Sequence, residues 1–158
     1  MSKQQGPMDL TQLRDRVAVV TGAGNHCIGW GLCCYAAGEL GMHVIVLDLH
    51  EKLVREAEQR LRELYPQVQC HGIACDVTEP EHLADAAARI CDLLPNRNIG
   101  AVFANAGVIF SHTIMNSTVQ EWETTLRVNI MGVVNTCLLY TSDAADDSLR
   151  VDLGGRRI

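Results

Sequence analysis

Long hydrophobic runs and positive charge are both scarce in this sequence. No apolar stretch reaches the roughly 20 residues that a membrane helix needs, and residues 1–10 are polar, without the apolar core of a secretory signal. Lys and Arg number 13 against 19 Asp and Glu, a formal net charge of −6. Nucleic acids and anionic membranes are bound by clustered cations, so we expect neither as a partner.

An ordered cysteine pattern is also missing. The seven cysteines are an odd number at scattered spacings, which does not predict a disulfide framework. We expect reduced thiols in the core of a cytoplasmic protein. Cys70 and Cys75 lie close to His71, but no second ligand pair follows at zinc-site spacing, so we expect no metal.

The chain does contain a regular alternation of strand and helix patterns. Its 158 residues, 47% of them hydrophobic, suffice for one globular domain. Short β-branched runs predict strands, and amphipathic or small-residue segments with capping signals predict helices. The strands are expected at 16–21, 43–48, 68–77 and 99–104, and the helices at 28–40, 51–64, from 79 onward with Thr78 as cap, and 118–136 with Ser117 or Thr118 as cap. This order predicts an α/β fold: the N-terminal half of a doubly wound Rossmann-type parallel sheet, about four strands with helices on both faces.

A glycine-rich turn, Thr21–Gly31, follows the first strand and opens the first helix. Glycines let the backbone approach a pyrophosphate, and the helix N-terminus offers free N–H groups and a positive dipole end. Asp48 ends the second strand, where a carboxylate can accept the ribose hydroxyls of a dinucleotide. The alternative for Asp48 is a cap of the following helix.

Four landmarks in this order resemble the short-chain dehydrogenase/reductase family. They are the Thr-Gly turn at 21–31, Asp76-Val77 ending the third strand, Asn105-Ala106-Gly107 ending the fourth, and Asn129 within Val128-Asn129-Ile130. Together they cover about residues 12–136. The resemblance implies an oxidoreductase that moves a hydride between NAD(H) and a small carbonyl or alcohol substrate, in a complete protein that is a homo-oligomer.

The resemblance also implies roles for single residues. Asp76 and Val77 contact the adenine, Asn105, Ala106 and Gly107 pack under the glycine turn, and Asn129 is the helix-bulge Asn of a catalytic tetrad that helps to hold a proton-relay water. The alternative for Asp76 is a helix cap, and for Asn105 a turn residue. The expected cofactor-binding set is Thr21, Gly22, Gly24, Ile28, Gly29, Asp48, Asp76, Val77, Asn105, Ala106 and Gly107.

The glycine turn departs from the family pattern. Six residues separate Gly22 from Gly29, one more than the pattern allows, and Cys27 stands where the middle glycine is expected. The segment 28–31 is also similar to the longer turn of the enoyl reductases of the same superfamily. The contact of the turn with a diphosphate is therefore expected to differ around residues 25–27, and His26 is a candidate phosphate contact.

The family's Tyr-x-x-x-Lys pair is absent from this sequence. Its lysines, Lys3 and Lys52, both precede Asn129, and Tyr140 is followed four positions later by Ala144. Without that pair, which transfers a proton to the substrate, we expect no useful hydride transfer from this chain. A non-catalytic dinucleotide-binding module is the alternative function. NAD is the expected cofactor rather than NADP, because Asp48 would repel a 2′-phosphate and no Arg occupies the next two positions, Leu49 and His50.

The last part of the sequence breaks the alternating pattern. Residues 137–146 and 151–158 can be written in codons that match a transposase sequencing-library adapter and its outer primer. The alternative is a divergent native tail. We therefore expect a flexible N-terminus at 1–11, a truncated NAD(P)-binding domain at 12–136 and an artefactual tail at 137–158.

Overall fold

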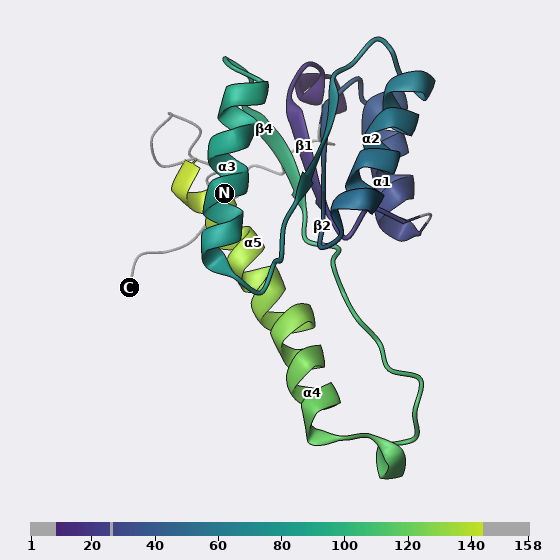
Figure 1. The fold of residues 1–158 in the computed structure, drawn as a ribbon. Coiled ribbons are helices and arrows are strands. Elements are labelled where there is room, and N and C mark those ends of the chain that lie inside the picture. Colours follow the sequence, from purple (N-terminus) through teal and green to yellow (C-terminus); the bar gives the residue numbers. More distant parts are fainter. Residues whose placement is uncertain (1–8, 26, 144–158) are drawn as a thin grey trace, which may run out of the picture.

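Four parallel strands form one sheet at the centre of the protein (Figure 1). The computed structural model describes residues 9–25 and 27–143. The strands are β1 (Val17–Thr21), β2 (His43–Asp48), β3 (Cys70–Ala74) and β4 (Ile99–Phe103), in the order β3-β2-β1-β4. The α/β prediction is confirmed, and β2 has the predicted bounds.

Helices cover both faces of the sheet, as predicted. On one face α1 (Ile28–Gly38) and α2 (Glu51–Leu64) pack against alternate residues of β1 and β2, among them Val20 and Val46. On the other face α3 (Pro80–Leu93) packs against Val19 and Ile45. Because both faces are covered, every residue of β1 is buried, which is why Val17–Val20 are continuously apolar rather than alternating.

The region after β3 is the clearest departure from the expected elements. A strand was expected to reach Val77, but β3 ends at Ala74. Asp76 Oδ1 accepts hydrogen bonds from the Thr78 N–H at 2.9 Å and from the Thr78 hydroxyl at 2.8 Å, which forms a turn. The prediction of Thr78 as the cap of α3 is also wrong: Glu79 occupies the N-cap position, and the Thr78 hydroxyl is engaged by Asp76.

The long helix begins where predicted. It is interrupted by a π-helical turn, and it is longer than expected. Thr118 caps it, with a reciprocal capping box to Glu121. A π-helical turn, Arg127–Met131, separates α4 (Val119–Leu126) from α5 (Gly132–Asp143). The helix was expected to end near Thr136 or to overrun into Leu138 and Leu139; it continues to Asp143 because no Gly or Pro interrupts residues 133–143. Residues 144–158 of the expected tail lie outside the described residues.

The remaining elements are short. A 3-10 helix, Leu10–Leu13, precedes β1, and another, Ile114–Asn116, lies in the connection between β4 and α4. The other predicted ends differ from the observed ones by one or two residues, among them Arg16, Leu40, Val68, Glu79 and Ala104. None of the helices in the described ranges is long and apolar enough to cross a membrane.

Candidate functional site

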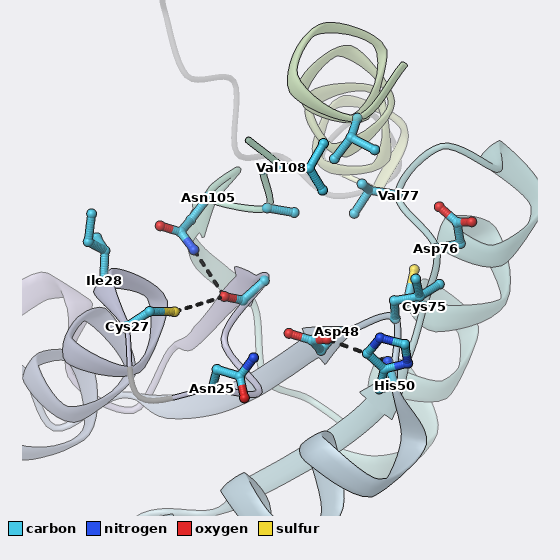
Figure 2. Close-up of a pocket in the computed structure, with 15 residues that line it drawn as sticks. Asn25, Cys27, Ile28, Asp48, His50, Cys75, Asp76, Val77, Asn105 and Val108 are labelled. Carbon is cyan, nitrogen blue, oxygen red and sulfur yellow. Dashed lines mark hydrogen bonds between the residues drawn. The ribbon is translucent and has the colours of Figure 1, made fainter. Parts of the chain in front are cut away.

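The carboxyl ends of the strands surround a cleft of about 410 Å³ (Figure 2). Ligands of open α/β sheets bind at this edge. The predicted cofactor-binding residues that line it are Gly22, Ile28, Asp48, Asp76, Val77, Asn105, Ala106 and Gly107. Thr21, Gly24 and Gly29 were predicted to bind cofactor but are not in its lining.

Two glycines allow the first turn to touch the end of β4. Gly22 has a φ of +65°, and a Cβ on it would lie 2.7 Å from the Ala106 Cα. A Cβ on Gly29 would lie 2.6 Å from the Asn105 Nδ2. Both positions therefore exclude a side chain, and together they bring the N-terminus of α1 to the rim of the cleft.

Thr21 and Asn105 join the same two segments by hydrogen bonds. The Thr21 Oγ1 accepts from the backbone N–H groups of Asn105 and Ala106, each at 3.0 Å. The Asn105 Nδ2 donates to the carbonyl oxygens of Thr21 at 2.9 Å and Gly22 at 3.2 Å. Thr21 thus supports the cleft from behind its surface, and Asn105 both lines the cleft and fixes the glycine turn.

Gly24 positions the Asp48 carboxylate. Its backbone N–H donates to Asp48 Oδ2 at 2.9 Å, and a Cβ on Gly24 would lie 2.9 Å from Asp48 Cγ. The alternative of Asp48 as a helix cap is met only in part: His50, not Asp48, is the N-cap residue of α2, but Asp48 Oδ1 accepts from the His50 N–H at 3.4 Å. The carboxylate lies in the cleft and keeps acceptor capacity for a ligand.

Comparison with known protein families matches most of this chain. The family model for the short chain dehydrogenase matches residues 16–147. This chain belongs to the short-chain dehydrogenase family. A curated relative, a cyclopentanol dehydrogenase of a Comamonas strain, is 26% identical over 123 residues, which cover 77% of this chain and 46% of the relative. The chain thus spans about half the length of that relative.

Solved structures of short-chain dehydrogenases share the fold. One from Mycobacterium smegmatis superposes with a TM-score of 0.79 at 23% identity, covering 87% of this chain and 55% of the other. A short-chain dehydrogenase/reductase from Burkholderia phymatum in complex with NAD has a TM-score of 0.73 at 25% identity, covering 82% and 44%. L-sorbose reductase from Gluconobacter frateurii, complexed with NADPH and L-sorbose, has a TM-score of 0.73 at 24% identity, covering 86% and 49%.

In this short-chain dehydrogenase chain, Asn129 lies in the π-helical turn and supports the cleft from outside. Its Oδ1 accepts from the Val108 N–H at 2.8 Å, and its Nδ2 donates to the Val108 carbonyl at 2.9 Å. The amide therefore holds the segment that follows β4. The role at a relay water, expected from the family resemblance, stays a prediction.

Several lining residues of the cleft were not among the predicted ones. They are Asn25, Cys27, Leu49, His50, Cys75, Val108 and Val128. Each is next to, or within two positions of, a predicted residue, so adjacency to the motifs was the available signal. Cys27 is exposed and its thiol lies 3.6 Å from the Gly22 carbonyl oxygen, whereas burial raises the pKa of Cys75 to about 11, which keeps that thiol protonated at neutral pH.

Two further expectations concern ligands at the site. His26, the candidate phosphate contact, lies outside the described residues. Within the described ranges, no group of three or more His, Cys, Asp or Glu side chains is arranged to hold a metal ion.

Proposed function

We propose that this chain forms the dinucleotide-binding half of an oxidoreductase that moves a hydride between NAD(H) and a carbonyl or alcohol. The observation that carries the proposal is the convergence of the glycine turn, Asp48, the segment 76–77 and the segment 105–107 on one cleft. With it go the sequence-based expectations of a small-molecule substrate, a cytoplasmic location and a homo-oligomeric complete protein.

The residues of the cleft fit such a cofactor. At Gly22 and Gly29, neighbouring atoms already occupy the positions that a side chain would need. Because the turn carries no side chain at these positions, a diphosphate can approach its backbone at the N-terminus of α1. Asp48 offers carboxylate oxygens to the ribose hydroxyls. Asp76 and Val77 form the wall proposed for the adenine. The bound nicotinamide ring would supply or accept the hydride, while these residues bind and orient the dinucleotide.

Asp48 supports a preference for NAD over NADP. Its negative charge would lie beside a 2′-phosphate, and the next two residues, Leu49 and His50, provide no guanidinium to offset it. A like-charge contact of this kind weakens binding about tenfold or more. We therefore expect the wild-type chain to bind NADH at least about tenfold more tightly than NADPH.

A fluorescence titration with NADH and NADPH tests this preference. Asp48→Ala should narrow the difference between the two cofactors. Glu51→Ala is the matched control, because Glu51 carries the same charge three residues away, is exposed, and pairs with Arg55 at 2.8 Å rather than lining the cleft. Equal affinity of the wild-type chain for both cofactors would refute the preference, and binding of neither would refute the proposed function.

Hydride transfer requires residues that this sequence does not contain. Because no Tyr-x-x-x-Lys is present, we expect the 158-residue chain to bind NADH without oxidising it. Sequencing the transcript past codon 136 separates the two functions considered above. A Tyr-x-x-x-Lys in the native continuation supports the enzyme, whereas a native message that encodes Cys137–Ile158 and then a stop codon would favour the binding module and contradict the adapter interpretation.

A further inference from the structure

Asn135 connects α5 to the wall of the cleft that follows β3. The residue is buried, with 8% of its surface exposed. Its Nδ2 donates to the backbone carbonyl oxygen of Val77 at 3.0 Å, across 58 positions of sequence. Val77 lines the cleft, but Asn135 does not. A buried side-chain amide that binds the backbone of a residue in the cleft lining fixes the position of that residue, and so the shape of the cleft.

Two other residues of the same helical segment contact this wall. A Cβ on Gly132 would lie 2.7 Å from the Val77 Cγ2, so the absence of a side chain allows Val77 to pack directly on the helix. The Arg127 guanidinium donates to the Thr78 Oγ1 at 3.2 Å and to a Glu79 carboxylate oxygen at 3.1 Å. Residues 127–135 therefore hold residues 77–79 at three consecutive positions.

Hydrogen bonds within the turn after β3 restrain its conformation only in part. Asp76 Oδ1 accepts from the N–H and the hydroxyl of Thr78, which fixes the backbone between these two residues. Those bonds set the local conformation of the turn, but they do not set its distance from the rest of the cleft. In the described part of the chain, that distance depends on the contacts from Arg127, Gly132 and Asn135, together with the Cys75 N–H, which donates to the Asp48 carbonyl oxygen at 2.8 Å.

We propose that Asn135 is a positioning residue for the adenosine half of the bound dinucleotide. This inference rests on the proposed function, in which Asp76 and Val77 form the adenine wall. Asn129 holds another part of the cleft lining at Val108, so one bulged helix holds two lining segments of the cleft. Loss of the Asn135 contact displaces the Val77 wall and leaves the Val108 wall in place.

The test compares ligands that contain the adenosine half with one that lacks it. Asn135→Asp keeps the shape of the side chain but replaces the donor with an acceptor that faces the Val77 carbonyl. We expect its affinity for NADH and for ADP-ribose to fall about 3- to 10-fold, the effect of one lost hydrogen bond. Its affinity for reduced nicotinamide mononucleotide should equal that of the wild type.

Thr136→Val is the matched control. Thr136 is buried beside Asn135, and its hydroxyl donates to the Gly132 carbonyl within the helix at 2.7 Å, without touching the turn after β3. This variant loses one buried hydrogen bond of its own and should bind all three ligands like the wild type. Equal losses in both variants, or a loss in Asn135→Asp that includes the mononucleotide, would overturn the inference.

A second variant covers the case in which Asn135→Asp does not fold. Arg127→Ala removes an exposed side chain that holds Thr78 and Glu79, so it should produce a smaller loss with the same selectivity for adenosine-containing ligands. Unchanged NADH binding in Arg127→Ala would then overturn the inference. Failure of the wild-type chain to bind NADH is a different result, since it contradicts the proposed function before any variant is compared.

Discussion

The glycines of the first turn differ in what surrounds their Cα atoms. Gly29 faces the Asn105 amide and the Gly22 carbonyl, both closer than 3 Å to the position of a Cβ. Gly31, two residues later in the same helix, has nothing within 4 Å of that position. The two glycines of the same motif therefore differ in their structural requirement: the position of Gly29 excludes a methyl group, and the position of Gly31 accepts one.

This difference predicts opposite effects of the same substitution. Gly29→Ala should destabilise the fold by about 1–3 kcal/mol through overpacking, and it should abolish NADH binding because the turn must move away from Asn105. Gly31→Ala should leave binding intact and stabilise the helix by up to about 1 kcal/mol. Urea unfolding and an NADH titration measure both effects. Similar behaviour of the two variants would contradict the structure of the turn.

A buried histidine, His43, and a half-buried one, His71, couple the stability of the fold to pH. The ring of His43 accepts from the Gln69 N–H at 3.0 Å, and the ring of His71 lies 3.0 Å from the Arg62 guanidinium. The Nε2 atoms of both rings are buried without a hydrogen-bond partner. Burial lowers the pKa of both, helped by Arg97 near His43 and by Arg62 near His71, while Asp15 and Glu58, respectively, oppose the shift.

Stability should therefore fall as the solution is acidified below neutrality. The unfolded chain, with histidine pKa values near 6.5, binds protons at a pH where the folded rings remain neutral. This contribution is fully present above about pH 6.5 and is lost as the pH falls toward the lowered folded values. Urea unfolding between about pH 5.5 and 7.5, above the range of ordinary carboxyl groups, measures the slope. His43→Gln should reduce the pH dependence of the free energy of unfolding, whereas His82→Gln, an exposed control, should leave it unchanged. An unchanged pH dependence in His43→Gln would contradict this prediction.

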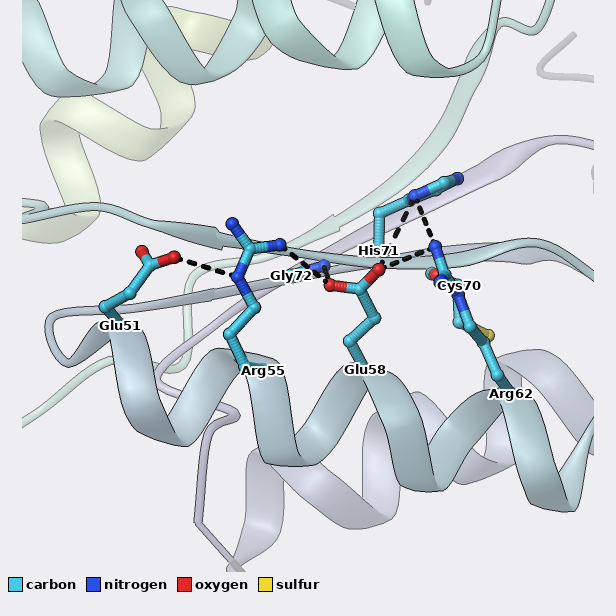
Figure 3. Close-up of polar contacts among 7 residues, drawn as sticks. All are labelled: Glu51, Arg55, Glu58, Arg62, Cys70, His71 and Gly72. Carbon is cyan, nitrogen blue, oxygen red and sulfur yellow. Dashed lines mark hydrogen bonds and ion pairs between the residues drawn. The ribbon is translucent and has the colours of Figure 1, made fainter.

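At the scale of elements, α2 protects the outer edge of the sheet (Figure 3). β3 is the last strand on its side, and side chains of α2 bind two of its outward backbone groups. The Gly72 N–H donates to Glu58 at 3.1 Å, and the Arg62 Nε donates to the Cys70 carbonyl at 2.8 Å. Glu58 is 8% exposed and also binds Arg55 at 3.2 Å and Arg62 at 2.6 Å. An edge satisfied in this way is a poor template for pairing with another chain.

Removal of the Glu58 carboxylate should expose this edge. Glu58→Ala leaves the Gly72 N–H unpaired and two arginines without their shared partner, at a cost of about 2–4 kcal/mol. Glu56→Ala is the control, because its carboxylate is 61% exposed and pairs with Lys52 at 3.8 Å, which is worth less than about 1 kcal/mol. Denaturant unfolding, with light scattering to detect self-association, compares them. Equal stability of the two variants would show that the edge does not depend on Glu58.

The elements that were predicted correctly depend on local patterns. The β-branched run His43–Asp48 and the amphipathic run Glu51–Leu64 form a strand and a helix with the expected bounds. The end of β3 was missed because the Asp76 side chain competes for the Thr78 N–H. The π-helical turn at Arg127–Met131 contains Asn129, for which only the family resemblance implied a helix bulge, since side-chain periodicity does not distinguish a one-turn bulge from a regular helix.

The site residues also divide into those that local sequence motifs predict and those that depend on tertiary packing. Gly22, Asp48 and the segment 105–107 belong to motifs with a fixed spacing, and the structure brings them to one cleft. Asn135 belongs to no such motif, and its contact with Val77 joins segments 58 positions apart. A contact of that kind follows from the packing of α5 beside α3, which the sequence pattern does not specify.

At the scale of the whole molecule, the cleft is built by segments that this chain already contains. The chain spans about half the length of the curated relative described above, with 46% of that protein covered. Yet the glycine turn, the end of β2, the turn after β3 and the end of β4 all contribute to the cleft. We therefore expect dinucleotide binding to be separable from hydride transfer, whose Tyr-x-x-x-Lys the sequence lacks.

Amide chemical shifts of the isotope-labelled chain, recorded with and without NADH, test this binding most directly. The largest changes should fall on the residues that surround the cleft, namely Gly22, Asn25, Cys27, Ile28, Asp48, His50, Asp76, Val77, Asn105, Gly107 and Val108. The amides of Arg55–Glu63, on the surface of α2 away from the cleft, should remain unchanged. Absence of any change at saturating NADH, or changes concentrated on α2 rather than on the cleft, would contradict a dinucleotide-binding function.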